Sequence, residues 1–239
     1  MKFKKLKFQR VLSMFVFLTL LLSVVFLVIR IIFAPADTPV DESRRTKSEY
    51  VLMLLQCTLG VIAMLLPGIL SKKFRIIVPS GIYILYVIFL YCAIYLGEVR
   101  SFYYNVSHWD SILHCFSGAM LGALGFSFVA LLNNTEKVPV NLSPCFVAVF
   151  AFCFAVTLGV IWEIYEFSFD GLLGLNMQKF SLEDGTLLQG REALMDTMKD
   201  LIVDALGALS TSIIGYISLK YKKGWIEKLQ IKRRRSAES

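Results

Sequence analysis

The chain has 239 residues, of which 56% are hydrophobic, and its mean hydropathy is +0.65. Soluble domains are usually less apolar, so this composition argues against a soluble domain and indicates a polytopic membrane protein. The formal charge of +7 does not indicate nucleic-acid binding, because the basic residues cluster at the ends of apolar runs and are not interleaved with aromatic residues.

Several apolar runs reach the length of about 20 residues that a helix needs to cross a bilayer. The first run follows five positive charges within residues 1–10. It is about 23 residues long, which exceeds the apolar region of a signal peptide, so we expect it to be retained as a span. The sequence thus predicts an all-α membrane protein, a bundle of six transmembrane helices in a single integral membrane domain that covers residues 1–239. The predicted spans are about 11–33, 49–70, 78–97, 110–132, 144–169 and 196–219, followed by a basic tail at 220–239.

Lysine and arginine are distributed unevenly between alternate loops. The N-terminal segment, the loops at 71–77 and 133–143, and the tail at 220–239 hold 17 of the 25 basic residues, whereas the alternate loops hold 6. Basic residues accumulate on the cytoplasmic side, so this asymmetry predicts that both termini lie in the cytoplasm. An even number of spans agrees with that orientation.

The five cysteines all lie in or beside apolar runs, and none forms a CxxC pair. We expect them to be small buried hydrophobic residues rather than parts of a disulfide framework or a zinc ribbon. The chain also lacks a G-x-S-x-G elbow, a P-loop and an HExxH motif. A serine nucleophile beside His114, such as Ser111 or Ser117, therefore has no supporting motif.

Ionisable side chains lie on one face of each of three predicted spans. The fourth span begins with HWDSILHCFSGAMLGALG at 108–125, in which Asp110 and His114 stand one helical turn apart. The stretch WEIYEFSFD of the fifth span places three acidic residues at i, i+3 and i+7, and DTMKDLIVDALG of the sixth places three at i, i+4 and i+8. These six residues are Glu163, Glu166, Asp170, Asp196, Asp200 and Asp204.

The predicted orientation puts all eight of these side chains at one leaflet. At 1.5 Å per residue, each falls within about 12 Å of the outer membrane boundary. The orientation rests on basic residues alone, so this agreement is independent support for convergence. Charges at such a depth are costly unless they pair, bind an ion or line a cavity. We therefore expect the three faces to meet at one site near the outer leaflet.

A divalent metal ion would relieve the repulsion among clustered carboxylates. Neutral imidazole with carboxylates suits Zn, Mn or Fe, whereas carboxylates with water suit Mg or Ca. A spacing of i, i+4 allows one helix to supply two ligands, as in Asp110 with His114 and in Asp200 with Asp204. The candidate metal ligands are His114, Asp110, Glu163, Asp200 and Asp204, and the candidate acid–base residues are Glu163, Glu166 and Asp200.

Several of these residues also suit roles without a metal. Asp196, Asp170 and His108 are compatible with solvated helix ends, and Asp196 in particular suits a helix N-terminus. Lys199 can neutralise one carboxylate, and two carboxylates can share a proton. The cluster is thus compatible with a metal site or with an arrangement of ion pairs and solvated charges.

Two further features would shape a site here. Small residues on the fourth and sixth spans allow those helices to approach closely, for packing alone or to hold a site rigid. The connection at about 170–195 is long and contains four glycines, and long connections are often functional lids, so we expect it to cover the cluster. The small residues are Gly118, Gly122 and Gly125, then Ala205, Gly207, Ala208, Ser210, Ser212 and Gly215.

The motifs WDSILHCFSGAMLG, WEIYEF and DTMKDLIVDALGAL together resemble the YjdF-like bacterial membrane proteins, a group of uncharacterised function. The resemblance covers roughly residues 78–219 in order and spacing, and it implies a bacterial cytoplasmic membrane without an established activity. A looser likeness is to VanZ-like proteins, which are linked to glycopeptide resistance. Their pattern has Gln where this chain has Glu166 and Asn where it has Asp204, so the likeness does not imply a shared ligand or substrate.

Three functions are compatible with the sequence. The first is a metal-dependent enzyme at the outer leaflet whose partner is membrane lipid, a small molecule or a lipid-linked envelope precursor. The second is an ion-coupled transporter that uses the carboxylates as a relay, and the third is an accessory membrane protein without catalysis. Below His114 and Asp204 the spans offer only hydroxyls and glycines, which favours a one-sided site and hence the enzyme. The sequence indicates no particular substrate or oligomeric state.

Overall fold

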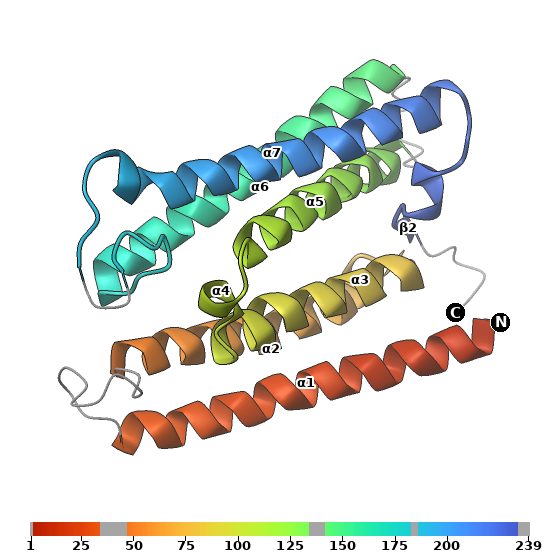
Figure 1. The fold of residues 1–239 in the computed structure, drawn as a ribbon. Coiled ribbons are helices and arrows are strands. Elements are labelled where there is room, and N and C mark those ends of the chain that lie inside the picture. The colour runs from red at the N-terminus through yellow and green to blue at the C-terminus, as the bar shows by residue number, and fades with distance from the viewer. Residues whose placement is uncertain (1, 34–46, 134–141, 183–185, 234–239) are drawn as a thin grey trace.

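The computed structural model describes residues 2–33, 47–133, 142–182 and 186–233 (Figure 1). Six helices in it are long and apolar enough to cross a membrane, which confirms the all-α membrane architecture that the composition predicts. These spans are α1 (Lys2–Phe33), α2 (Lys47–Lys73), α3 (Ser80–Leu90) with its π-helical continuation η1 (Tyr91–Val99), α5 (Trp109–Asn133), α6 (Pro144–Leu173) and α7 (Arg191–Lys220). The short elements are β1 (Ile76–Ile77), α4 (Phe102–Asn105), the 3-10 helix η2 (Ile226–Lys228) and β2 (Lys232–Arg233).

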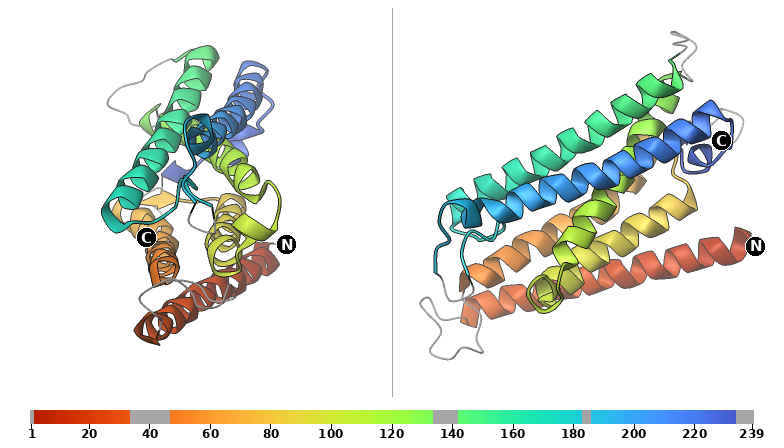
Figure 2. Two further views of the ribbon diagram at one scale, coloured as in Figure 1. Left: turned by 60° about the vertical axis from the view of Figure 1, so that its left-hand side comes forward. Right: turned by 45° about the horizontal axis from the view of Figure 1, so that its top comes forward.

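The spans form two groups of three helices (Figures 1 and 2). In the first group, α1, α2 and α3 with η1 share a core that includes Leu20, Cys57 and Val87. In the second group, α5, α6 and α7 pack around a core that includes Phe126 and Ala151. The start of α1 and the end of α7 lie at the same end of the molecule (Figure 1). All three predicted stripes of ionisable residues belong to the second group.

Glycines bring α5 and α7 into direct backbone contact. A Cβ atom at Gly118 would overlap the carbonyl group of Asp204, and a Cβ atom at Gly207 would overlap the carbonyl group of Cys115. The prediction that small residues allow the fourth and sixth spans to approach closely is therefore confirmed. This contact places the acidic face of α7 beside the first turns of α5.

The connection between α6 and α7 joins the two helix groups. Its Leu175 and Met177 side chains are buried in one cluster with Leu52 of α2. A second link lies at the start of α5, where the indole N–H of Trp109 donates a hydrogen bond of 3.3 Å to the carbonyl oxygen of Cys92 in η1. These links position the connection and the start of α5 relative to each other.

The segment after α7 turns back onto the helix ends. β2 pairs antiparallel with β1, so this segment reaches the connection between α2 and α3. Ile226 is buried, and the backbone N–H of Ile231 donates to the hydroxyl of Ser127 on α5. The predicted basic tail is thus packed as far as residue 233, and its residues 234–239 lie outside the described ranges.

The structure corrects two sequence-based expectations. Cys115, Cys145 and Cys153 are exposed rather than buried. Lipid is as apolar as a protein core, so an apolar neighbourhood in the sequence does not distinguish core positions from lipid-facing ones. In addition, α7 begins at Arg191, so Asp196 lies in the second turn of that helix rather than at its N-terminus.

Candidate functional site

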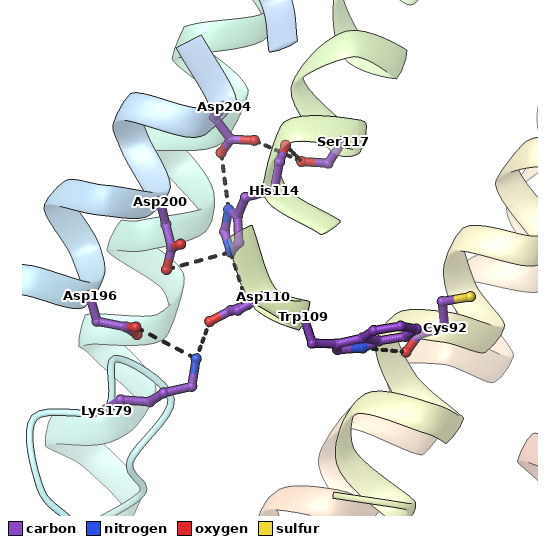
Figure 3. Close-up of polar contacts among 9 residues, drawn as sticks. All are labelled: Cys92, Trp109, Asp110, His114, Ser117, Lys179, Asp196, Asp200 and Asp204. Atoms are coloured by element: carbon purple, nitrogen blue, oxygen red, sulfur yellow. Dashed lines mark hydrogen bonds and ion pairs between the residues drawn. The ribbon is translucent and has the colours of Figure 1, made fainter. Parts of the chain in front are cut away.

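His114 stands at the centre of a polar cluster between α5 and α7 (Figure 3). Its Nε2 atom lies 3.6 Å from Oδ1 of Asp110, one turn earlier on α5, and 3.8 Å from Oδ2 of Asp200 on α7. One possible ligand atom from each of these three residues lies within 4.8 Å of the other two, and a single metal ion can bridge such a spacing. The structure thus brings together residues that the sequence predicts to converge.

The other ring nitrogen of His114 is held by Asp204. Nδ1 lies 3.2 Å from Oδ2 of Asp204, whose Oδ1 accepts a hydrogen bond of 2.8 Å from the Ser117 hydroxyl. Gly159 of α6 leaves space for this carboxylate, because a Cβ atom there would lie 2.9 Å from Oδ2. Asp204 therefore faces Nδ1, whereas Asp110 and Asp200 face Nε2. Of the five predicted metal ligands, Asp110, His114 and Asp200 form a group that could hold one ion, and Asp204 lies at the other ring nitrogen. Glu163 is not part of that group among the described residues.

Lys179, from the connection between α6 and α7, inserts a positive charge among the acidic residues. Its ammonium group pairs with Oδ2 of Asp110 and lies 3.6 Å from Oδ1 of Asp196. Burial alone would lower the pKa of Lys179, but the nearby Asp110 and Asp196 carboxylates outweigh burial and hold the pKa above its usual value. Lys199, which the sequence offers as a neutralising residue, is exposed and forms no ion pair within the described part of the chain.

The backbone of the connection is fixed so that Lys179 reaches the cluster. Asp170, near the end of α6, is buried, and its carboxylate accepts hydrogen bonds from the backbone N–H groups of Met177 (2.7 Å) and Gln178 (3.0 Å). Lys179 itself adopts a left-handed backbone conformation with a φ of 49°. Asp170 is thus buried and fixes the backbone of the connection, rather than being solvated at a helix end. We call its carboxylate with the two backbone N–H groups the Asp170 clamp. The connection lies against the cluster, as the sequence predicts.

Glu163 and Glu166 approach the cluster from α6. Only 5% of Glu163 is exposed, and neither of its carboxylate oxygens has a hydrogen-bond partner among the described residues. The hydroxyl of Thr197, which accepts a hydrogen bond of 2.8 Å from the side-chain amide of Gln178, is a neighbour of Glu163. Both glutamates are buried, and Glu163 lies one helical turn after Gly159, which contacts the Asp204 carboxylate.

Tyr103 of α4 lies between Lys179 and the first group of helices. The ammonium nitrogen of Lys179 is 5.2 Å from the centre of the Tyr103 ring, and a Cβ atom at Gly97 of η1 would overlap that ring. Burial, with the negative charges of Glu98 and Asp110, raises the pKa of Tyr103 well above its usual value, so the phenol keeps its proton at neutral pH.

From the sequence, we assign no role in the site to Lys179 or Tyr103, and we weigh Ser117 only as a nucleophile without a supporting motif. Lys179 and Tyr103 lie in connections, where no periodicity shows which side chain points inward. Ser117 lies on the same helical stripe as Asp110 and His114, and that stripe is the signal that identifies it. His108 is exposed, in agreement with a solvated helix end.

A family model described as a predicted membrane protein (DUF2238) matches residues 12–221, which include every residue of the cluster. The chain belongs to this family. A relative from Thermotoga maritima, described only as an uncharacterised protein, is 32% identical over 122 residues, which are 51% of this chain and 54% of the relative. The chain thus spans about half the length of the curated relative that it matches. No solved structure matches the chain.

Membership in the DUF2238 family agrees with the multi-pass membrane location that the six long helices indicate. None of these matches supports the likeness to VanZ-like proteins. The family description names no activity.

Proposed function

We propose that this protein is a metal-dependent enzyme of the bacterial cytoplasmic membrane, with a divalent ion held by Asp110, His114 and Asp200. The observation that supports this is the arrangement around the imidazole, in which Nδ1 faces Asp204 and Nε2 faces two other carboxylates. Histidines that bind metals commonly donate their other ring N–H to a carboxylate, which fixes the tautomer and the orientation of the ring. One nitrogen and two carboxylate oxygens suit Zn, Mn or Fe.

The remaining glutamates suit proton transfer. Glu163 is buried, lacks a hydrogen-bond partner among the described residues and lies on the face of α6 that contacts the Asp204 carboxylate, so its carboxylate is available to accept a proton. Glu166 lies beside it and can share that proton. A divalent ion would supply Lewis acidity to a substrate oxygen. In this scheme Asp200 is a ligand, Asp204 orients the imidazole, and Ser117 holds Asp204.

The position of the cluster points to a substrate at the outer leaflet. The uneven distribution of basic residues supports an orientation with both termini in the cytoplasm. The start of α1 and the end of α7 lie together at one end of the molecule, and the connection that carries Lys179 lies toward the opposite end (Figure 1). A lipid or a lipid-linked envelope precursor would reach the site from that side.

Packing in the inner half of the second group favours an enzyme over an ion-coupled transporter. Below Asp204, a Cβ atom at Gly122 would lie 3.3 Å from the side chain of Thr211, and one at Gly215 would overlap the ring of Phe126. Phe126 is fully buried at this contact. The α5–α7 interface is therefore closely packed between the cluster and the inner side. Its polar side chains there are hydroxyls such as those of Thr211 and Ser212, whereas a relay would need ionisable groups. An accessory protein without catalysis would not need the oriented imidazole.

The family match covers the same part of the chain as the resemblance to the YjdF-like proteins. The matched residues 12–221 include the whole of the three motifs around His114, Glu163 and Asp200. We infer that the YjdF-like group and the DUF2238 family are the same set of proteins. This inference adds no activity to the one proposed above.

Metal analysis of the full chain purified in detergent tests the proposed centre. We expect wild-type protein to bind a divalent ion, and we expect His114→Ala and Asp200→Asn to lose it while still inserting and purifying. His108→Ala is the matched control, because His108 is the other histidine of the chain and is exposed. Equal metal content in His114→Ala and in this control would overturn the centre.

Lipid analysis separates the enzyme from its alternatives. Extracts of cells that produce wild-type protein or His114→Ala are compared by mass spectrometry, and we expect a lipid or lipid-linked species to be consumed or formed only with the wild type. An ion flux into proteoliposomes that His114→Ala abolishes would support the transporter instead. Unchanged lipids and no flux, with metal retained, would support the accessory role.

A further inference from the structure

The two oxygens of Asp110 face two different cationic or metal-binding positions. Oδ1 lies 3.6 Å from Nε2 of His114, on the side where the proposed ion would bind. Oδ2 pairs with the ammonium group of Lys179. A carboxylate with this arrangement can bridge two cations, as in two-metal enzymes, whose ions lie about 3.5–4 Å apart.

The surroundings of the Lys179 ammonium group resemble a cation site rather than a chance surface pairing. Besides Asp110, the carboxylate of Asp196 lies 3.6 Å away, and the ring of Tyr103 lies 5.2 Å away, within the range of a cation–π contact. The Asp170 clamp fixes the backbone just before Lys179, which adopts a left-handed conformation. The chain therefore delivers this ammonium group to a defined place.

The cluster contains more carboxylates than Lys179 alone can pair with. Six carboxylates of α5, α6 and α7 lie in or beside the cluster, and Glu163 among them is more than nine-tenths buried without a hydrogen-bond partner in the described ranges. It lies one helical turn after Gly159, which contacts the Asp204 carboxylate, so Glu163 is on the face of α6 that meets the cluster. A buried carboxylate with no partner is costly, and an ion next to it offsets that cost.

We propose that the Lys179 ammonium group occupies the second cation position of a carboxylate-bridged pair, so that the protein binds one divalent ion where the cluster would otherwise hold two. The inference rests on the proposed function, because the first position is the one formed by Asp110, His114 and Asp200. Lys179 is a positioning residue here. It contributes one positive charge without the coordination demands of a metal. With Lys179 in place, the Asp110 carboxylate bridges the proposed ion and the ammonium group.

Metal titration of the full chain in detergent with Mn²⁺ tests this inference. Calorimetry should show one ion per chain for the wild type and two for Lys179→Met, since removal of the ammonium group vacates a position that Asp110 and Asp196 still line. Lys179→Arg keeps the charge and should again bind one ion. Lys199→Met is the matched control, because Lys199 is a basic residue of α7 that is exposed, and it should also bind one ion.

Electron paramagnetic resonance of the bound Mn²⁺ gives a readout that a structural role for Lys179 would not produce. Lys179→Met should show the spectrum of two coupled ions, and the other three proteins that of an isolated ion. If Lys179→Met does not fold, Lys179→Gln provides the same test. A single ion in both neutral variants would overturn the inference while leaving the proposed centre in place. A wild type that binds no ion would overturn the proposed centre itself.

Discussion

Asp204 of α7 holds the imidazole of His114 on α5, with 3.2 Å between Oδ2 and Nδ1. The carboxylate is held in turn, because Ser117 donates a hydrogen bond to its other oxygen and Gly159 of α6 leaves room beside it. Three helices thus fix one ring, and the Nε2 atom is directed toward Asp110 on the same face. The orientation of the His114 ring therefore depends on the packing of α6 and α7 against α5 as well as on the position of His114 in α5.

This relationship predicts that Asp204→Asn weakens metal binding without unfolding the protein. The amide keeps the size of the side chain but removes the charge that stabilises an N–H on Nδ1. Loss of such an orienting partner typically costs about tenfold to a hundredfold in metal affinity. Competition with a chelating dye in detergent measures the affinity. Glu192→Gln, an exposed neutralisation on the same helix, should leave it unchanged, and equal affinities in the two variants would contradict the role of Asp204.

The contact between Gly118 and Asp204 predicts a stability defect coupled to metal loss. A methyl group at Gly118 would overlap the Asp204 carbonyl, which is backbone and can move only with its helix. Overpacking of this kind costs about 1–3 kcal/mol. We expect Gly118→Ala to lower the thermal unfolding midpoint and to reduce the bound metal. Gly171→Ala, where a Cβ atom meets nothing within 4 Å, should be as stable as the wild type.

The sequence is sufficient to predict the spans and the convergence because both depend on regular spacing. Apolar length identifies the six helices, and the i, i+4 spacing of Asp110 with His114 and of Asp200 with Asp204 places each pair on one helical face. The glycines that let α5 and α7 touch are also visible in the sequence, and Gly118 and Gly207 act as expected.

Features that depend on the path of the connections could not be predicted in this way. Lys179 reaches Asp110 only because Asp170 caps the backbone of Met177 and Gln178, and no periodic pattern encodes that turn. The same limit explains why the sequence offers Lys199 as the neutralising residue. Its place on α7 suggests proximity to the acidic stripe, but its side chain is exposed.

The orientation of the protein is a prediction that labelling can test. In a background without native cysteines, Gln189→Cys in the connection between α6 and α7 should react with an impermeant maleimide on intact cells. Lys228→Cys, in η2 beyond the end of α7, should react only after permeabilisation. Both positions are outside the spans, and Gln189 and Lys228 are exposed, so access depends on the side of the membrane. Labelling of Lys228→Cys on intact cells would reverse the proposed orientation and move the cluster to the inner leaflet.

The Asp170 clamp predicts that one side chain controls the order of the connection over the site. Asp170→Ala removes the acceptor of two backbone N–H groups, and hydrogen bonds to a charged group contribute about 1.5–3 kcal/mol each. We expect faster amide hydrogen exchange at Met177 and Gln178, measured by mass spectrometry. We also expect a weaker ion pair between Lys179 and Asp110. Asp196→Asn separates the two effects, since it removes a partner of Lys179 but leaves the clamp intact. Asp196→Asn should therefore preserve slow exchange at the Met177 and Gln178 amides. If exchange is also slow in Asp170→Ala, the buried Leu175 and Met177 side chains alone order the connection.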